Sequence, residues 1–460
     1  MLETIERVLS QAVGFIWNWP VVMLCLGGGL YFTVRLGFIQ FRGFPHALKV
    51  VAGRYDRAGE PGAISHYQAL SAALSATVGL GNIAGVAIAV KMGGPGAVFW
   101  MWMIGLLGMA TKFTECGLAT HFRTTLPSGE VRGGPMYYIV RGLGARWRWL
   151  AILFSTFCVI ASFGIGDMFQ SNQTAQVLRD YFGVPVWVTG GVMAALVALV
   201  IIGGIRRIGQ VAGYLVPFMC ATYVIGAGII CLIHFGEWCA MLGVIVRDAF
   251  SLRPLVGGSL GAVIIIGVRR ALFSSESGFG SAPIAHAAAR SEVGMRQGFV
   301  ALLEPFIDTI VVCSATASVI LLSGTYLNSQ ADGVSLTVQA FDHFFPGFGS
   351  IFVSYAVTLF AFSTAISWSY YGEVSAHHLF GERAVAPYKW CFVLFFFIGA
   401  IWTLTPIMNF SDVANALMLI PNVLVLFALS NVAARLTGDY FAKLRRKEFT
   451  MDPVRRVKTG

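Results

Sequence analysis

Eleven apolar stretches, each about 20 residues or longer, run through this chain of 460 residues. A helix needs about 20 residues to cross a hydrocarbon layer of ~30 Å. Only 12% of the residues are charged, whereas soluble domains carry roughly 25%. We therefore expect an all-α integral membrane protein with about 11 transmembrane helices. The predicted spans lie near residues 12–33, 65–90, 95–120, 149–175, 184–203, 208–234, 256–286, 297–323, 348–371, 386–405 and 409–434.

The chain lacks the sequence patterns of an enzyme or a metalloprotein. Its 8 cysteines are scattered through apolar segments without CxxC spacing, and its 8 histidines form no HExxH pattern. The glycine spacing that begins at Gly79 is not a dinucleotide fingerprint, because no hydrophilic βαβ unit surrounds it. We expect no enzymatic activity and no cofactor apart from a coupling ion.

The basic residues predict how the chain is oriented. Lys and Arg in short loops stay on the cytoplasmic side of a membrane. Most of the 32 basic residues share the side of the C-terminus, and the opposite side holds Arg7, Lys91, Arg179, Arg247 and Arg253. We expect a multi-pass protein of the plasma membrane with its N-terminus outside and its C-terminus in the cytoplasm. The basic tail fits this topology and anionic lipid better than nucleic acid.

The ten spans after the first divide into two sets of five. Five is odd, so the two sets begin on opposite sides of the membrane, which is the arrangement of an inverted repeat. The predicted parts are an N-terminal helix with a basic loop (1–64), a first repeat (65–235), a second repeat (256–436) and a cytoplasmic tail (437–460).

The first helix of each repeat is rich in glycine and polar residues near its middle. The two segments read "TVGLGNIAG" (77–85) and "RRALFSSESGFGSAPIAH" (269–286). A broken helix is tolerated in a membrane only where it is buried in protein or lines a cavity. Its free N–H groups attract an anion and its free carbonyls attract a cation, so the pair predicts a binding site. The competing interpretation is close helix packing, since "GNIAG" is also a GxxxG motif.

Seven ordered motifs resemble the alanine or glycine:cation symporter family, also called sodium:alanine symporters, and the resemblance runs from about Ser65 to Leu436. The motifs are "VGLGNIAGVA" (78–87), "GGPGAVFWMW" (93–102), "GMATKFTE" (108–115), "GGPMYY" (133–138), "FSSESGFGSAPIAHAAA" (273–289), "LFAFSTAISWSYYGE" (359–373) and "DVANALMLIPN" (412–422). The resemblance implies a leucine-transporter-type fold and alternating-access symport of a small neutral amino acid with a cation, sodium in the first place.

This chain departs from the family pattern within the two breaks. The family usually has Thr at the position of Leu80, and Gly, Asn and Ala at those of Ala271, Ser275 and Ser277. Carriage of a different amino acid therefore stays open beside alanine and glycine. Coupling to protons is a second alternative, and a passive channel is a third from another class.

The resemblance also implies the residues of the site. The substrate is expected to contact Leu80, Gly81, Gln170, Phe273, Ser274, Ser275, Gly278 and Trp368. Sodium is expected at Ser75, Val78, Asn82, Ser363 and Thr364, because a hard cation prefers carbonyl and hydroxyl oxygens. Asn82 has a second interpretation as the cap of the half-helix after the break.

Charged residues inside spans are costly and usually form pairs. Lys112 and Glu115 are three residues apart, so we expect them to neutralise each other on one helical face. Glu276 flanks the second break, and Glu304 and Asp308 follow on the next helix; one of these carboxylates is the candidate for carrying a coupled proton. The segment "VSLTVQAFDHFF" (334–345) is typical of an extracellular amphipathic helix that forms part of an outer gate.

Overall fold

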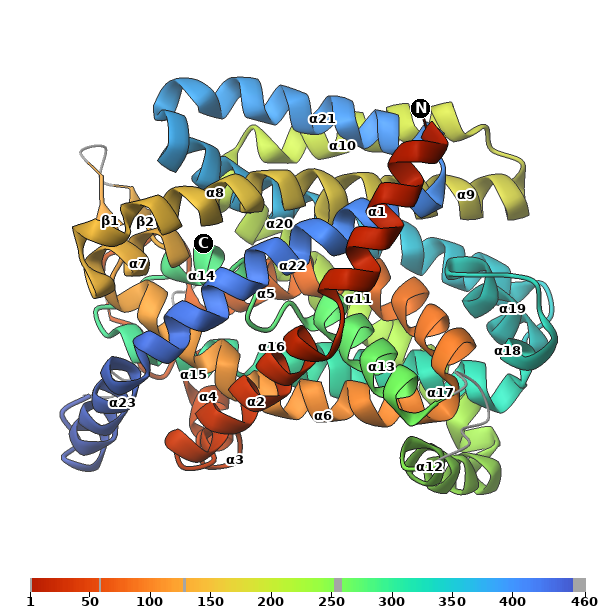
Figure 1. Ribbon diagram of the computed structural model, residues 1–460, viewed down its shortest axis with the longest axis horizontal. Helices are drawn as coiled ribbons and strands as arrows, with labels where there is room; N and C mark the ends of the chain where they lie inside the picture. Colours follow the sequence, from red (N-terminus) through yellow and green to blue (C-terminus); the bar gives the residue numbers. More distant parts are fainter. Residues whose placement is uncertain (1, 58, 127–129, 252–258, 450–460) are drawn as a thin grey trace, which may run out of the picture.

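The chain folds into a bundle of long helices with a single short hairpin at one end (Figure 1). The computed structural model describes residues 2–57, 59–126, 130–251 and 259–449. The prediction of an all-α fold is confirmed, because the only strands among the described residues are β1 (Thr124–Thr125) and β2 (Val131–Arg132), paired antiparallel. The start of the predicted span 256–286 and residues 450–460 of the predicted tail lie outside the described residues.

The helices follow one another along the chain in three groups. The first group is α1 (Leu2–Ile16), α2 (Trp19–Arg35), α3 (Ile39–Arg42), α4 (Phe44–Val51), α5 (His66–Thr77), the π-helical η1 (Gly81–Gly85), α6 (Val86–His121), α7 (Pro135–Leu143) and η2 (Ala145–Trp147). The second is α8 (Arg148–Phe163), the π-helical η3 (Gly164–Met168), α9 (Phe169–Phe182), α10 (Val186–Ile201), α11 (Gly204–Ile233), α12 (Phe235–Ala249), α13 (Leu260–Ser275) and α14 (Ala282–Ala287). The third is α15 (Gly294–Ala301), α16 (Leu303–Pro305), the π-helical η4 (Phe306–Cys313), α17 (Ser314–Ser323), α18 (Thr325–Asn328), α19 (Val334–Phe344), α20 (Phe348–Phe380), η5 (Glu382–Ala384), α21 (Val385–Ile401), α22 (Leu404–Ala428) and α23 (Ser430–Arg445).

The predicted number of eleven spans is not confirmed. Among the described residues, 7 helices are long and apolar enough to cross a membrane, or up to 8 if the bent pair α1 and α2 is counted as one span. The two numbers differ because several predicted spans are bent, short or broken. The predicted span 12–33 bends by 47° between α1 and α2, where Asn18 accepts a hydrogen bond from the Trp19 backbone N–H and Pro20 follows in the first turn.

Both predicted breaks are present. The first lies between α5 and η1, at Val78, Gly79 and Leu80. A further kink at Gly94, with a φ of 68°, divides α6 into two helices and separates the predicted spans 65–90 and 95–120. The second break lies between α13 and α14, where Glu276, Gly278 and Gly280 all have positive φ. Glycine adopts these angles at little cost, whereas Glu276 at 52° is a strained position for a residue with a side chain.

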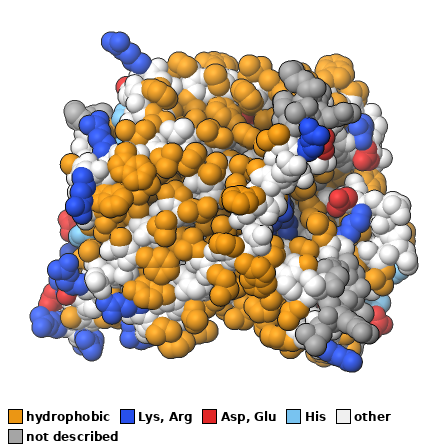
Figure 2. Space-filling model, in the orientation of Figure 1, with side chains coloured by type: hydrophobic (Ala, Val, Ile, Leu, Met, Phe, Trp, Pro, Cys, Tyr) orange, Lys and Arg blue, Asp and Glu red, His pale blue; other side chains and the backbone are white. Residues whose placement is uncertain are grey.

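The surface of the molecule is apolar in its middle and charged at one end. Figure 2 shows hydrophobic side chains over most of this face, with Lys and Arg gathered along the left edge. That end of the molecule carries α3, α4, α7, α23 and the hairpin, while α18 and α19 lie at the opposite end (Figure 1). Large apolar side chains remain exposed in the middle, for example Tyr214 at 85%. A surface of this kind is stable in hydrocarbon and not in water.

Candidate functional site

The first break frees backbone N–H groups, and side chains accept their hydrogen bonds. The Gly79 N–H donates to Asn82 Oδ1 over 2.9 Å, and the Leu80 N–H donates to Gln170 Oε1 over 3.3 Å. Leu80 and Gln170 are both predicted substrate contacts, and in this structure they are hydrogen-bonded to each other. A carboxylate oxygen that replaced the Gln170 oxygen would receive the same Leu80 N–H, which lies beside the partial positive charge of a helix start.

Four of the five predicted sodium ligands gather at the end of α5. Ser75 Oγ donates to the Ser363 carbonyl over 2.5 Å, and Ser363 Oγ lies 3.4 Å from the Ser75 carbonyl. Val78 is the residue that caps α5. A Cβ added to Gly79 would stand 2.2 Å from Thr364 Oγ1, so the break and α20 touch here. Thr364 Oγ1 is buried and has no hydrogen-bond partner among the described residues. Together these residues offer carbonyl and hydroxyl oxygens, which suit a hard cation.

The fifth predicted sodium ligand, Asn82, is bound to an acidic residue that the resemblance did not indicate. Its Nδ2 donates to the Asp308 carboxylate of η4 over 2.6 Å. Ser274 Oγ, from the end of α13, donates to the same carboxylate over 3.0 Å, as does Thr309 Oγ1 over 2.8 Å. Asn82 therefore satisfies the Gly79 N–H and also joins the first break to the second through Asp308. It is not the N-cap of η1, because that position is Leu80.

The two breaks are in direct contact. A Cβ added to Gly81 would stand 3.0 Å from Ser274 Cα and 3.5 Å from the ring of Phe273. Only a glycine permits the first break to approach α13 this closely. Phe273 packs edge-on against Phe169 at 5.2 Å between ring centroids. The predicted substrate residues Gly81, Phe273 and Ser274 are thus brought together.

Gly278 and Ser275 lie in the turn of the second break. The Gly278 N–H donates to Glu115 Oε1 over 3.3 Å, and its carbonyl accepts from Asn422 Nδ2 over 2.8 Å. Asn422 Nδ2 also donates to Glu115 Oε2 over 3.0 Å, while Ser275 Oγ accepts from the Ser277 N–H. These bonds satisfy the backbone of the break, and sequence reasoning gave Glu115 and Asn422 no such role.

Trp368 connects the second break to η3. It is fully buried in α20, and its Nε1 donates to Glu276 Oε1 over 2.7 Å. A Cβ added to Gly166 of η3 would stand 2.2 Å from Trp368 Cβ. Gln170 lies one turn further along the same helix. The indole is held in place by these contacts, at the junction of the second break with the helix that carries Gln170.

The predicted ion pair between Lys112 and Glu115 is wrong. Lys112 Nζ lies 3.2 Å from Glu304 Oε2, and both side chains are fully buried. Glu115 instead binds the second break, as described above. Helical spacing predicted the wrong partner because α15 and α16 pack against α6, and α16 brings Glu304 next to Lys112. Arg269 and Arg270 likewise find a distant partner, since both bind the carboxylate of Asp412 in α22.

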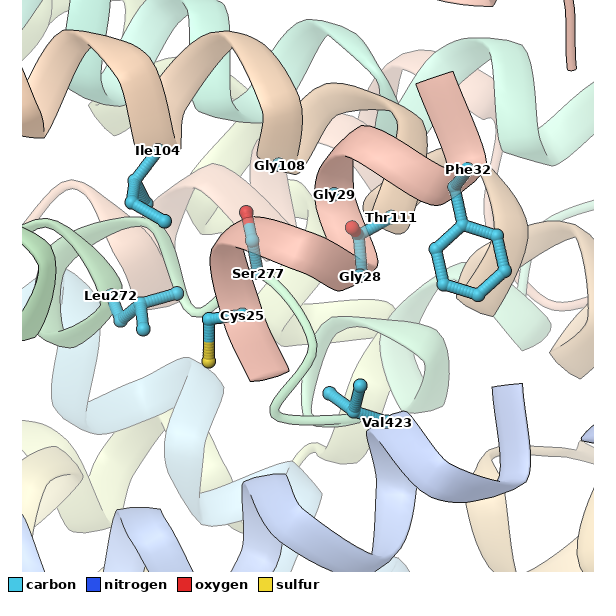
Figure 3. A pocket seen from close by; sticks show the side chains of 10 residues that line it. All are labelled: Cys25, Gly28, Gly29, Phe32, Ile104, Gly108, Thr111, Leu272, Ser277 and Val423. Carbon is cyan, nitrogen blue, oxygen red and sulfur yellow. The ribbon is translucent and has the colours of Figure 1, made fainter. Parts of the chain in front are cut away.

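The helix α2, from the first predicted span, lies beside the second break. Figure 3 shows Cys25, Gly28 and Gly29 of α2 facing Ser277, with Gly108 on the far side. A Cβ at Gly108 would stand 2.6 Å from Ser277 Oγ, and a Cβ at Gly29 would stand 2.7 Å from Leu107. The glycines therefore allow α2 and α6 to approach, and the first span is part of the wall around the break.

The predicted amphipathic helix is confirmed as α19, and it covers the first break from the other end. Thr337 Oγ1 donates to the Ile83 carbonyl of η1 over 3.2 Å. The Val334 N–H donates to Gln173 Oε1 over 3.4 Å. α19 therefore contacts both η1 of the first break and α9, the helix that carries Gln170 (Figure 1).

A helical bundle with an apolar surface, in which two interrupted helices meet in the buried interior, is the architecture of a membrane transporter. Comparison with solved structures gives the same class. The fold is similar to that of MhsT, crystallised with L-phenylalanine, with a TM-score of 0.59 and 14% identity over 85% of this chain and 96% of that one. This likeness establishes a leucine-transporter-type fold.

The family follows from the sequence comparisons. The model of the sodium:alanine symporter family matches residues 2–454. The sodium/alanine symporter AgcS of Methanococcus maripaludis is 41% identical over 96% of this chain and 98% of its own length. The probable sodium/glutamine symporter GlnT of Bacillus subtilis is 33% identical over 99% of this chain and 94% of its own. The chain belongs to the sodium:alanine symporter family.

Proposed function

We propose that this protein is a secondary active transporter that carries a small neutral amino acid, such as alanine or glycine, together with sodium by alternating access. The observation that carries the proposal is the contact between the two breaks at Gly81 and Ser274. Next to that contact, the Leu80 N–H can bind a carboxylate, and Ser75, Val78 and Thr364 offer cation ligands. A bound sodium ion would lie close to the substrate carboxylate, which links the two binding events.

The end with α4 and α23 is proposed to face the cytoplasm. Basic side chains gather there (Figure 2), as expected for cytoplasmic segments. The end with α19 then faces outward. In this orientation α19 contacts the first break on the outside, and α5 packs against α14 on the inside.

Thermal unfolding of the purified protein tests substrate and ion together. A ligand that binds only the folded state raises the unfolding midpoint by mass action. We expect alanine or glycine to raise the midpoint in the presence of sodium and not in potassium, in a screen of the twenty amino acids and their D-forms. A midpoint that no amino acid moves in either salt contradicts the proposed function.

Proton coupling is the second candidate, and Asp308 is the observation that favours it. Its buried carboxylate accepts hydrogen bonds from Asn82, Ser274 and Thr309, and among the described residues it forms no ion pair. Uptake measured at a fixed membrane potential, with sodium and pH varied separately, distinguishes the two ions. Uptake that ignores sodium and follows the proton gradient would replace the sodium mechanism. Counterflow of labelled substrate against its gradient separates either carrier from a channel.

Thr364→Ala is expected to weaken sodium binding. A lost hydroxyl ligand to a charged group costs roughly 1.5–3 kcal/mol, which corresponds to a sodium requirement raised about 10- to 150-fold. Ser354→Ala is a matched control. Ser354 is a buried α20 residue whose hydroxyl also has no hydrogen-bond partner in the described part of the chain, and it lies ~15 Å from Thr364 toward the start of the helix. The half-saturating sodium concentration for uptake is the measurement, and equal values in both variants would remove Thr364 from the ion site.

Leu80→Thr is expected to change which amino acid is preferred. Leu80 is fully buried between the two glycines of the first break, so its side chain fills space next to the proposed carboxylate site. One methylene in an apolar pocket changes relative affinity about 10- to 200-fold. If the wild type prefers a residue larger than alanine, the shorter Thr should shift preference toward alanine and glycine in the same thermal screen. An unchanged order of preference would mean that Leu80 does not face the substrate.

A further inference from the structure

An open apolar groove lies on the surface of the molecule where α10, α11 and α20 meet. It has a volume of about 620 Å³, and most of the side chains that line it are apolar, among them Met193, Leu196, Val211, Leu215, Leu359 and Phe362. Two more of its residues, Tyr214 and Phe218, are largely exposed. In a bilayer an open groove of this kind is filled, because empty space forfeits the contacts of every atom that lines it. The surrounding hydrocarbon supplies the material that fills it.

Two arginines stand where α11 begins, at one end of the groove. Val211 and Phe218 follow Arg207 by four and eleven residues, and positions with this spacing share one face of a helix. Arg207 therefore continues the groove-lining face of α11 by one turn toward the start of the helix. Arg206 precedes it, and both side chains are exposed. Neither arginine has a hydrogen bond or an ion pair among the residues that the structure describes.

The Arg207 side chain points away from the groove and along its axis. A Cβ added to Gly203 would stand 2.4 Å from Arg207 Cδ, so the aliphatic part of Arg207 lies over the turn between α10 and α11. The guanidinium therefore reaches past the start of α11. Arginine side chains take this course where a helix meets the surface of a membrane.

The distance between the arginines and the far end of the groove matches one leaflet. Phe218 follows Arg207 by 11 residues, which is ~16 Å along a helix. Half of a hydrocarbon layer of ~30 Å is about 15 Å. A lipid whose phosphate binds Arg207 would therefore place one acyl chain along the groove as far as Phe218.

The neighbouring helices offer no acid to neutralise the two arginines. No acidic residue occurs between Asp180 and Glu237, and α20 has none before Glu373. A phosphate diester is a good partner, since its oxygens accept charge-assisted hydrogen bonds from guanidinium groups. A second copy of the chain is a poorer one. Copies related by a two-fold axis along the membrane normal would bring like charges together at the same depth.

We propose that an anionic phospholipid binds this groove, with its phosphate on Arg206 and Arg207 and one acyl chain between α10, α11 and α20. The lipid belongs to the leaflet at the start of α11, which is the predicted cytoplasmic side. This site does not depend on the proposed transport function, but it lies close to the first break. The Tyr67 hydroxyl of α5 donates to the Gly213 carbonyl of α11 over 2.8 Å. A bound chain thus packs on two helices, α11 and α20, that both contact α5.

Two photoactivatable lipids with the same diazirine-bearing acyl chain test the site, one with a phosphatidylglycerol and one with a phosphatidylcholine headgroup. Purified full-length protein is reconstituted in phosphatidylcholine vesicles that contain a small fraction of one probe, and after irradiation the labelled segments are located by mass spectrometry. An arginine near a membrane surface strengthens the binding of an anionic lipid about 5-fold. We therefore expect the phosphatidylglycerol probe to label the groove about 25-fold more than the phosphatidylcholine probe. Both probes should label the far part of α11, residues 225–233, equally.

The paired substitution Arg206→Gln with Arg207→Gln tests the headgroup contact. It should bring the ratio of the two probes in the groove close to one. Arg435→Gln with Arg445→Gln is the matched control, because it removes two exposed arginines of α23, and it should keep the wild-type ratio. Equal labelling of the groove by both probes in the wild type overturns the proposal, and so does an unchanged ratio in the folded Arg206 and Arg207 variant.

A second variant tests the acyl-chain contact. Leu215→Trp fills the groove, so labelling by the phosphatidylglycerol probe should fall on α10 and α20 as well as on α11. Ala198→Trp is its control, because Ala198 lines the neighbouring groove between α10 and α21. Unchanged labelling in Leu215→Trp contradicts the proposal. A groove that neither probe labels, in a dimer that Leu215→Trp separates, would assign it to a second copy of the chain instead.

Discussion

Gly79→Ala is expected to reduce transport about 100-fold or more, since a displacement of ~1 Å at a site of this kind has that effect. The added Cβ would stand 2.2 Å from Thr364 Oγ1 and 3.5 Å from Gln170 Oε1. Thr364 cannot move away easily, because it is buried in α20, which packs against both α5 and α9. The first break must therefore shift away from the proposed sodium ligands and from Gln170, which accepts the Leu80 N–H.

Gly85→Ala is the matched control for this prediction. Gly85 belongs to the same short segment, is equally buried, and a Cβ there would meet no atom within 4 Å. Alanine is also a better helix former than glycine, so the variant should fold and transport normally. The measurements are initial uptake of labelled substrate in proteoliposomes and the unfolding midpoint. If Gly79→Ala transports as well as Gly85→Ala, the contact between the first break and Thr364 is not needed for function.

The positions of both breaks could be predicted from the sequence, because glycine and polar residues inside an apolar run are locally visible. Ser363 and Thr364 were assigned to the end of α5 by family resemblance, since no spacing rule connects residues so far apart. The bend in the first span had a local signal that was not used. Asn18 before Trp19 and Pro20 is the usual start of a helix, and it divides the apolar run 12–33.

The partners of buried charges could not be predicted from helical spacing. Residues three apart on a helix are neighbours, which favoured Lys112 with Glu115. In the folded chain a buried charge binds the partner that packing brings, and for Lys112 that partner is Glu304 on another helix. Asp308 was visible as an acid within a span, but its contact with Asn82 depends on how η4 packs against the first break.

Lys112→Met is expected to lower the free energy of unfolding by about 3–5 kcal/mol, the usual cost of removing one member of a buried ion pair. Methionine has a similar length, so little packing is lost. The effect arises because Glu304 stays fully buried with its charge, while its second oxygen loses the ammonium at 3.2 Å. We expect the unfolding midpoint in detergent to fall by on the order of 10 °C. Lys49→Met is the control, because Lys49 is exposed on α4, and surface changes usually stay within about 0.5 kcal/mol.

A second substitution identifies the partner that Lys112 neutralises. Glu304→Gln in the Lys112→Met background removes the unpaired charge, so it should restore part of the lost stability, whereas Glu304→Gln alone should destabilise. That non-additivity is the signature of a direct interaction. Glu115→Gln in the same background should restore nothing, because Glu115 binds the Gly278 N–H and Asn422. Rescue by Glu115→Gln and not by Glu304→Gln would mean that Lys112 pairs with Glu115, as helical spacing alone predicts. In that case Glu304 would keep only its contact with His286 Nε2.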